Sequence, residues 1–290
     1  MGRARAAAVV LLALLAGCAS RVPIVDAHVH LNDVEMQVGL MEEFGIDRAV
    51  VFWGVRSNDE KVLEAAGRHP QRFIPFASIS PERSAFRPMW QRDDSAILAR
   101  LESLLATGRF RGIGEISVVH DATSGFAATA FSPMSPTMRG ILALARRHRL
   151  PVMVHCERSH LEPFTEMLAA HRDVTVIWAH GGYTDAATAR RMLEANPNLY
   201  YELSARTWPR HPRSDAYTIM PGNVLAPEWR SLVEAMPGRF LVGTDASHHV
   251  LENEKMKARS VRAFLDQLSP GARREVAAGT LLRLLGERGP

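Results

Sequence analysis

The stretch IVDAHVHL, residues 24–31, is the first apolar run after the N-terminal segment, and polar side chains occupy alternate positions in it. Successive side chains of a β-strand point to opposite faces, so Asp26, His28 and His30 share one face, with the two imidazoles roughly 7 Å apart. Burying unpaired polar groups is costly, so this face predicts a bound ligand such as a metal ion. The alternative is a polar strand end in solvent. We expect the opposite face to pack beneath helices; it holds Val25, Ala27 and Val29.

Short apolar runs alternate with amphipathic stretches along the rest of the chain. The predicted strands are 24–31, 48–54, 73–79, 111–117, 151–156, 174–180, 199–204 and 240–246. The predicted helices are 35–44, 59–68, 94–106, 136–149, 160–171, 184–195, 227–236, 253–267 and a last one at 270–285. Eight such units require parallel strands and predict an α/β fold closed into a (β/α)8 TIM barrel. A doubly wound open sheet is the alternative, but no glycine-rich phosphate turn follows an early strand.

Polar side chains end several of these predicted strands. The C-terminal strand ends of such a barrel form one mouth, which is where its active site is built. Closure of the barrel also brings the last strand beside the first. The side chains placed at the mouth are His28 and His30 on strand 1, Glu115 on strand 4, His155 on strand 5, His180 on strand 6 and Asp245 on strand 8. Four histidines with one or two carboxylates are typical metal ligands.

This set of residues resembles the amidohydrolase superfamily over residues 22–286. Asp26-x-His28-x-His30 matches its strand-1 motif, and His155, His180 and Asp245 match its positions on strands 5, 6 and 8. The segments AHGG (179–182), PEW (227–229) and VGTD (242–245) are similar to the narrower amidohydrolase-related family that includes aminocarboxymuconate-semialdehyde decarboxylase. The resemblance implies a metal-dependent TIM-barrel enzyme that holds a divalent ion, most simply Zn²⁺.

The resemblance leaves the number of ions open. Many superfamily members bridge two metals with a carboxylated lysine on strand 4, but Glu115 stands at that place here. With two ions, Glu115 would bridge them and His180 would be a ligand. Glu115 could equally hydrogen-bond to the ligands without touching the metal, or be a structural carboxylate at the strand end. We expect one ion, with His180 as a catalytic group; the ligands would then be His28, His30, His155 and Asp245.

The resemblance implies hydrolysis of an amide, ester, lactone or related bond of a small molecule by metal-activated water. Asp245 would take the water proton and His180 would stabilise charge on the substrate oxygen. The alternative is a non-oxidative decarboxylase of an aromatic or muconate-like acid, which needs a cation such as Arg206, Arg210 or Arg213 near the substrate carboxylate. We also expect substrate contacts near the mouth from Arg206, His248 and His249. A third hypothesis is a lipoprotein that binds metal or ligand without catalysis.

The N-terminus resembles a bacterial lipoprotein signal peptide at residues 1–17. Arg3 and Arg5 precede the apolar stretch 6–16, which is shorter than the roughly 20 residues that span a bilayer. The sequence LAGC at 15–18 is similar to the lipoprotein cleavage box, so Cys18 is expected to carry a lipid anchor. This predicts an exported cell-envelope lipoprotein, in the outer membrane facing the periplasm; an ordinary signal peptide is the alternative.

The remaining 18–290 segment is expected to form one domain. No linker rich in proline, glycine and serine divides it, and 290 residues in total suit a single barrel after a leader. The net charge is +4, but the basic residues are scattered and no run reaches five, so nucleic-acid binding is disfavoured. The expected partner is a small-molecule substrate, and an oligomer remains possible.

Overall fold

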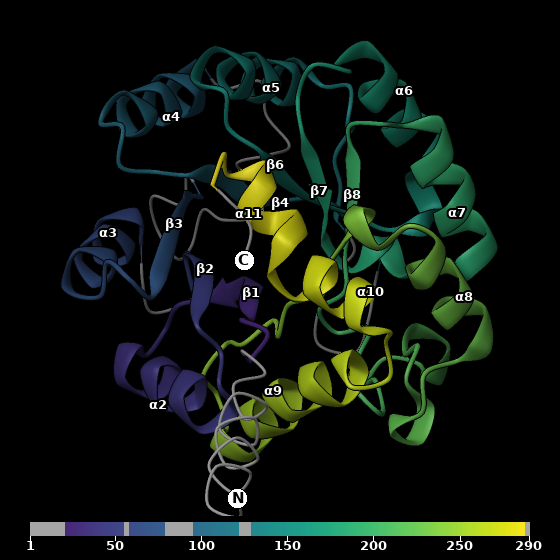
Figure 1. Cartoon of the computed structure of the whole chain (residues 1–290). Coiled ribbons are helices and arrows are strands. Elements are labelled where there is room, and N and C mark those ends of the chain that lie inside the picture. Colours follow the sequence, from purple (N-terminus) through teal and green to yellow (C-terminus); the bar gives the residue numbers. More distant parts are fainter. Residues whose placement is uncertain (1–20, 55–57, 79–94, 122–128, 288–290) are drawn as a thin grey trace, which may run out of the picture.

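The computed structural model describes residues 21–54, 58–78, 95–121 and 129–287. Eight parallel strands follow one another around a barrel (Figure 1). Hydrogen bonds from β1 to the segment after β9 close it: Ala27 N–H donates to Val242 O (2.8 Å), and His30 N–H donates to Ala246 O (2.8 Å). The strands, in the order of their pairing, are β1 (Val25–His30), β2 (Arg48–Phe52), β3 (Phe73–Ala77), β4 (Gly112–His120), β6 (Val152–Cys156), β7 (Val176–Trp178), β8 (Leu199–Glu202) and β9 (Phe240–Leu241). The predicted (β/α)8 barrel is confirmed.

A ring of helices surrounds the strands (Figure 1). The ring consists of α2 (Val34–Phe44), α3 (Asp59–Arg68), α4 (Ser95–Ala106), α5 (Pro136–His148), α6 (Leu161–Ala170), α7 (Ala186–Ala195), α8 (Pro227–Ala235) and α9 (Leu251–Leu265). Short polar residues begin several of them, because their side chains accept otherwise unpaired N–H groups of the first turn. Asp33 begins α2, Ser135 begins α5 and Asp185 begins α7 in this way. The predicted last helix is three joined segments: α10 (Pro270–Arg274), a π turn η7 (Glu275–Gly279) and α11 (Thr280–Leu284).

Two apolar layers hold this arrangement. The larger packs the outer strand faces against the ring of helices, and the smaller fills the barrel interior, where α11 closes the end at which the strands begin. The expectation that residues 25, 27 and 29 all pack beneath helices is wrong for two of them: Val25 and Ala27 belong to the interior cluster, and only Val29 packs on the helix side. The pairing of β1 with β2 shifts register between Asp26 and Val29, which interrupts simple alternation.

Several strands end differently from the prediction. β7 stops at Trp178, just before His180 adopts a left-handed backbone conformation that an extended strand does not accommodate. β9 stops at Leu241, and Asp245 in the segment after it is also left-handed. β4 continues to His120, where it pairs with an additional antiparallel strand, β5 (Thr129–Ala130). The early ends of β7 and β9 and the extension of β4 all lie at the mouth of the barrel.

Residues 1–20 lie outside the described part of the chain, and with them the predicted signal peptide and Cys18. Within the described residues, no helix has the length and apolar character required to cross a membrane. The lipid anchor therefore stays a prediction.

Candidate metal centre

Glu115 lies at the middle of the barrel mouth. Its Oε2 is 3.4 Å from His30 Nε2 and 3.7 Å from His28 Nε2. Its Oε1 is 2.8 Å from His155 Nδ1 and 3.6 Å from His180 Nε2. Each oxygen of one carboxylate therefore faces a different pair of imidazoles.

Asp245 completes this group from the segment after β9. Its Oδ1 lies 3.6 Å from the Nε2 atoms of both His28 and His30. The structure thus brings together all six residues that the sequence placed at the mouth. We call them the mouth cluster: His28, His30, Glu115, His155, His180 and Asp245.

Hydrogen bonds outside the cluster orient three of its imidazoles. His30 Nδ1–H donates to the carbonyl of Trp53 (3.0 Å), and His180 Nδ1–H donates to the carbonyl of Ser204 (3.0 Å). His28 Nδ1 lies 3.2 Å from a carboxylate oxygen, Glu202 Oε2. Because carbonyl and carboxylate oxygens accept, each Nδ1 carries a proton, and in the neutral form of each ring the lone pair of Nε2 faces the cluster. This tautomer is the one a metal ion requires.

Glu202 contacts the cluster and is not singled out in the sequence analysis. It is fully buried at the end of β8 and accepts hydrogen bonds from Ser204 Oγ (2.7 Å) and the His180 N–H (3.3 Å), besides its contact with His28. The signal was present, because an acidic residue ends the run Leu199-Tyr200-Tyr201 just as polar residues end the other strands.

Asp26 supports the cluster without joining it. Its Oδ1 accepts from the N–H groups of His28 (3.0 Å) and Thr244 (2.9 Å), and its Oδ2 accepts from Thr244 Oγ (2.6 Å). Burial raises the pKa of this carboxyl to about 6, although these hydrogen bonds act in the opposite direction. Asp26 therefore joins β1 to the segment that carries Asp245.

A turn of left-handed backbone positions the His180 side chain in the cluster. All four residues of His180-Gly181-Gly182-Tyr183 have φ between 51° and 57°. Such a conformation costs of order 1–3 kcal/mol for a residue other than glycine, and persists only where surrounding contacts enforce it. Arg206 supplies them: its guanidinium donates to the carbonyls of His180 (3.4 Å) and Thr184 (2.8 Å). The Tyr183 ring stacks on the His180 ring, with centroids 5.3 Å apart.

The three predicted substrate contacts take different places. Arg206 is 1% exposed beneath the turn just described, where it also donates to Tyr201 Oη (2.7 Å). His248 is buried, donates to Gln37 Oε1 (2.9 Å) and accepts from the Asn32 N–H (3.2 Å). Burial lowers the pKa of His248 to about 4, so it is neutral. His249 is exposed. The structure thus gives Arg206 and His248 protein partners and leaves only His249 open to solvent.

The cluster fits a divalent metal on its own chemistry. His28 Nε2 is buried and has no hydrogen-bond partner in the described residues, although it faces two carboxylates. Burial raises the pKa of Asp245, but nearby histidines more than offset this and hold the pKa below its usual value, so the carboxylate is ionised. Imidazole nitrogens and carboxylate oxygens are ligands of Zn²⁺ and similar ions. An ion placed here would satisfy the unpaired Nε2.

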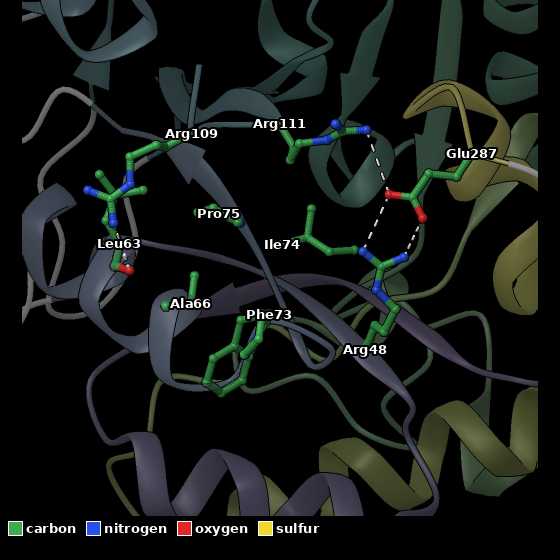
Figure 2. Close-up of a pocket in the computed structure, with 11 residues that line it drawn as sticks. Arg48, Leu63, Ala66, Phe73, Ile74, Pro75, Arg109, Arg111 and Glu287 are labelled. Carbon is green, nitrogen blue, oxygen red and sulfur yellow. Dashed lines mark hydrogen bonds and ion pairs between the residues drawn. The ribbon is translucent and has the colours of Figure 1, made fainter. Parts of the chain in front are cut away.

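A separate cleft lies at the opposite end of the barrel (Figure 2). Its volume is about 370 Å³, and Phe73 at the start of β3 and Leu63 of α3 contribute to its apolar lining. Glu287 pairs there with Arg48 and Arg111. This cleft is remote from the mouth cluster and has its main charges paired, so we assign no catalysis to it.

Comparison with known proteins agrees with this geometry. The sequence profile of the amidohydrolase family matches residues 25–286. The chain belongs to the amidohydrolase family. It is therefore an enzyme, a metal-dependent hydrolase, and the family implies a divalent metal. The narrower resemblance to the decarboxylase-containing family is not confirmed. No curated protein matches the sequence.

Solved structures confirm the barrel of this amidohydrolase. An uncharacterized TIM-barrel protein from Bordetella bronchiseptica has a TM-score of 0.66 at 16% identity, over 91% of this chain and 98% of that chain. A probable 2-pyrone-4,6-dicarboxylic acid hydrolase from Acinetobacter baumannii has a TM-score of 0.58 at 13% identity, over 91% and 99%. An amidohydrolase from Burkholderia multivorans with bound zinc has a TM-score of 0.53 at 15% identity, over 91% and 99%.

Proposed function

We propose that this amidohydrolase cleaves an amide, ester, lactone or related bond of a small molecule with metal-activated water, and that its mouth cluster would hold two divalent ions, with Glu115 as a ligand shared between them. The observation that carries the proposal is the position of Glu115, with one oxygen facing His28 and His30 and the other facing His155 and His180. This arrangement favours two ions over the single ion that we expected from the sequence. The zinc bound in one related structure supports Zn²⁺.

Two residues of the chain are assigned the other steps of hydrolysis, proton transfer and stabilisation of charge on the substrate. A divalent ion, when bound, would supply an activated water nucleophile and polarise the bond to be cleaved. Asp245, ionised and on the more exposed side of the cluster, is placed to accept the proton of the attacking water and return it to the leaving group. The Tyr183 hydroxyl has no hydrogen-bond partner in the described part of the chain, and its ring lies against His180. We assign it to donate to the substrate oxygen on which charge develops.

The structure gives less support to the decarboxylase alternative. That reaction needs a free cation for the substrate carboxylate, and two of the three candidate arginines are already engaged. Arg206 is buried under the His180 turn, and Arg213 forms two hydrogen bonds to Glu157. A neighbour described as a probable hydrolase of a pyrone, which is a lactone, supports hydrolysis instead.

The deciding experiment measures metal content and hydrolysis in the same preparation. We expect about two zinc ions per chain, and turnover of at least one member of a panel of lactones, esters and amides. Asp245→Asn should lower kcat by roughly 10²- to 10⁴-fold, the usual size of a general-base contribution, while the far-ultraviolet circular dichroism stays unchanged. Asp173→Asn, at an exposed carboxylate, is the matched control.

Three outcomes contradict separate parts of the proposal. One ion per chain would remove the bridging role of Glu115. Wild-type turnover by Asp245→Asn would remove the general base. A zinc-loaded protein that releases carbon dioxide from aromatic acids, but hydrolyses nothing in the panel, would establish the decarboxylase alternative.

We further infer from residues 1–18 that the enzyme is exported and anchored by a lipid on Cys18. Expression of the full chain in a bacterium with a radiolabelled fatty acid should label the wild-type protein and not Cys18→Ser. Equal labelling of both chains would exclude the anchor.

A further inference from the structure

A buried acid–arginine pair lies directly behind His155, on the side away from Glu115. Glu157 Oε1 is 3.2 Å from His155 Nε2. Arg213 donates through Nη1 to Glu157 Oε1 (2.8 Å) and through Nη2 to Oε2 (3.0 Å). Glu157 is 1% exposed, and a guanidinium donates to both of its oxygens, the arrangement in which a carboxylate carries its charge.

This group is not a further metal site, although it offers metal-ligand atoms. His120, His155 and Glu157 place one potential ligand atom each within 4.8 Å of the others. Both oxygens of Glu157, however, already accept from the Arg213 guanidinium in the two-pronged geometry that binds a carboxylate strongly. A cation added there would meet a fixed positive charge, so the group requires another role.

The consequence for His155 follows from the two nitrogens of its ring. Nδ1 faces Glu115 Oε1 at 2.8 Å, whereas Nε2 faces Glu157. A carboxylate without a proton only accepts, so in the metal-free protein the ring can donate from both nitrogens, to Glu115 and to Glu157. An ion beside Glu115 would replace the proton on Nδ1, and Glu157 would keep the remaining proton on Nε2, so that the Nδ1 lone pair faces the ion. Without Glu157, the proton of a neutral ring would be drawn to Nδ1 by Glu115, and the lone pair would face away from the centre.

His155 is in this respect the exception within the mouth cluster. The other three histidines turn Nε2 toward the cluster and hold Nδ1 on an outer acceptor. The acceptors of His30 and His180 are backbone carbonyls, which the fold fixes in place. The acceptor of His155 is a side chain, and its orientation depends on a second side chain, Arg213.

Arg213 itself belongs to the long segment after β8. Its guanidinium lies over the rings of Tyr183 (5.2 Å) and Tyr217 (5.1 Å), and its backbone N–H donates to His211 Nδ1 (3.1 Å). The position of this segment is thereby connected, through Glu157, to the tautomer of a metal ligand.

We propose that Glu157 and Arg213 are positioning residues that keep His155 Nδ1 available to a metal ion beside Glu115. Glu157 fixes the proton on Nε2, and Arg213 fixes Glu157. The proposal rests on the proposed function only in requiring that an ion binds between His155 and Glu115. It assigns to the segment after β8 a role in metal affinity that is separate from any contact with substrate.

The test compares zinc affinity among full-length variants by competition with a chromophoric chelator. Glu157→Ala should weaken zinc binding by about 10- to 100-fold, the usual cost of losing a partner outside the metal ligands. Glu157→Gln, whose amide oxygen still accepts from Nε2–H, should recover part of that loss. Arg213→Lys should lie between wild type and Glu157→Ala. The matched control is Glu275→Ala, which removes an exposed acid–arginine pair with Arg283 and should leave zinc affinity unchanged.

A spectroscopic measurement separates positioning from a general effect on folding. In the zinc-loaded wild type, ¹⁵N NMR of the histidine rings should identify His155 as metal-bound through Nδ1 and protonated at Nε2. In Glu157→Gln this Nε2–H signal should exchange faster with water. Arg213→Lys serves as the second variant if Glu157→Ala does not fold.

The outcomes are distinguishable from those of the proposed function. If wild type binds zinc and both Glu157→Ala and Arg213→Lys bind it equally well, the positioning proposal is overturned while the hydrolase assignment stands. If wild type binds no divalent ion, the proposed function fails first. A loss of affinity in the Glu275→Ala control equal to that in Glu157→Ala would also overturn the positioning role.

Discussion

The two ends of the barrel differ in how their charged side chains are paired. At the mouth, Glu115 faces four imidazoles, and His28 Nε2 is buried without a hydrogen-bond partner in the described residues. At the end where the strands begin, Glu287 pairs with Arg48 and Arg111 in a cleft that apolar side chains also line (Figure 2). The mouth gathers potential ligand atoms around one carboxylate, whereas the acid that lines the opposite cleft is paired with two arginines. The difference assigns chemistry to the first and stability to the second, as in other barrels of this kind.

The backbone shows the same contrast. At the mouth, His180 and Asp245 hold left-handed conformations that only surrounding contacts maintain. At the other end, Leu281, Leu282 and Leu285 near the C-terminus pack into the barrel interior. The mouth thus combines left-handed backbone at two cluster residues with an unpaired ring nitrogen, at the end where we place the metal. Three experiments test this comparison.

Removal of metal should produce the largest effect. Burial alone would lower the pKa of His28, but the carboxylates of Glu115 and Glu202 more than offset this and raise the pKa to about 10. Burial would also lower the pKa of His155, but Glu115 and Glu157 raise it to about 9. A histidine whose pKa is raised by folding stabilises the folded state fully at pH values below its pKa in the unfolded chain, which is 6.5. This stabilisation is lost as the pH rises through the pKa of the folded state. The metal-free protein should therefore lose stability between pH 6.5 and about 10.

The zinc-loaded protein is the control for this pH dependence. Its ligating histidines carry no proton on the metal-facing nitrogen, so the loss over that pH range should be absent. Urea unfolding at several pH values, with zinc or with a chelator, measures both curves. Parallel curves would mean that the mouth histidines do not titrate as described, and the contrast between the two ends would lose its electrostatic basis.

The sequence predicted those parts of the molecule that depend on local pattern. Alternating apolar runs located all eight barrel strands, and the polar side chains at strand ends located the mouth cluster. Long-range pairing was not predictable: Glu157 and Arg213 are 56 residues apart, and no local pattern connects them. The left-handed turn at His180 is not predictable either, because the contact that enforces it comes from Arg206, which is 26 residues away in the sequence.

Asp26→Ala should have an intermediate effect, on both stability and zinc affinity. It leaves three donors, on His28 and Thr244, without their acceptor in a buried site. Unpaired buried groups of this kind cost about 1–3 kcal/mol, so the free energy of unfolding should fall by roughly 3 kcal/mol. Zinc affinity should fall as well, because Asp26 fixes the segment that carries Asp245. A stability loss of that size with unchanged zinc affinity would separate this part of the mouth from the metal centre.

Glu287→Gln, at the opposite end, should have the smallest effect. Glu287 and Arg48 are about one-third exposed, so solvent screens their attraction, and the amide oxygen of glutamine still accepts a hydrogen bond. We expect the free energy of unfolding to fall by about 1 kcal/mol or less, as for other exposed ion pairs. Zinc affinity should not change, because the pair lies at the end of the barrel remote from every ligand. Urea unfolding and chelator competition on the same preparation measure both quantities. A change in zinc affinity there would mean that the two ends are coupled through the barrel interior, and the division between them would have to be abandoned.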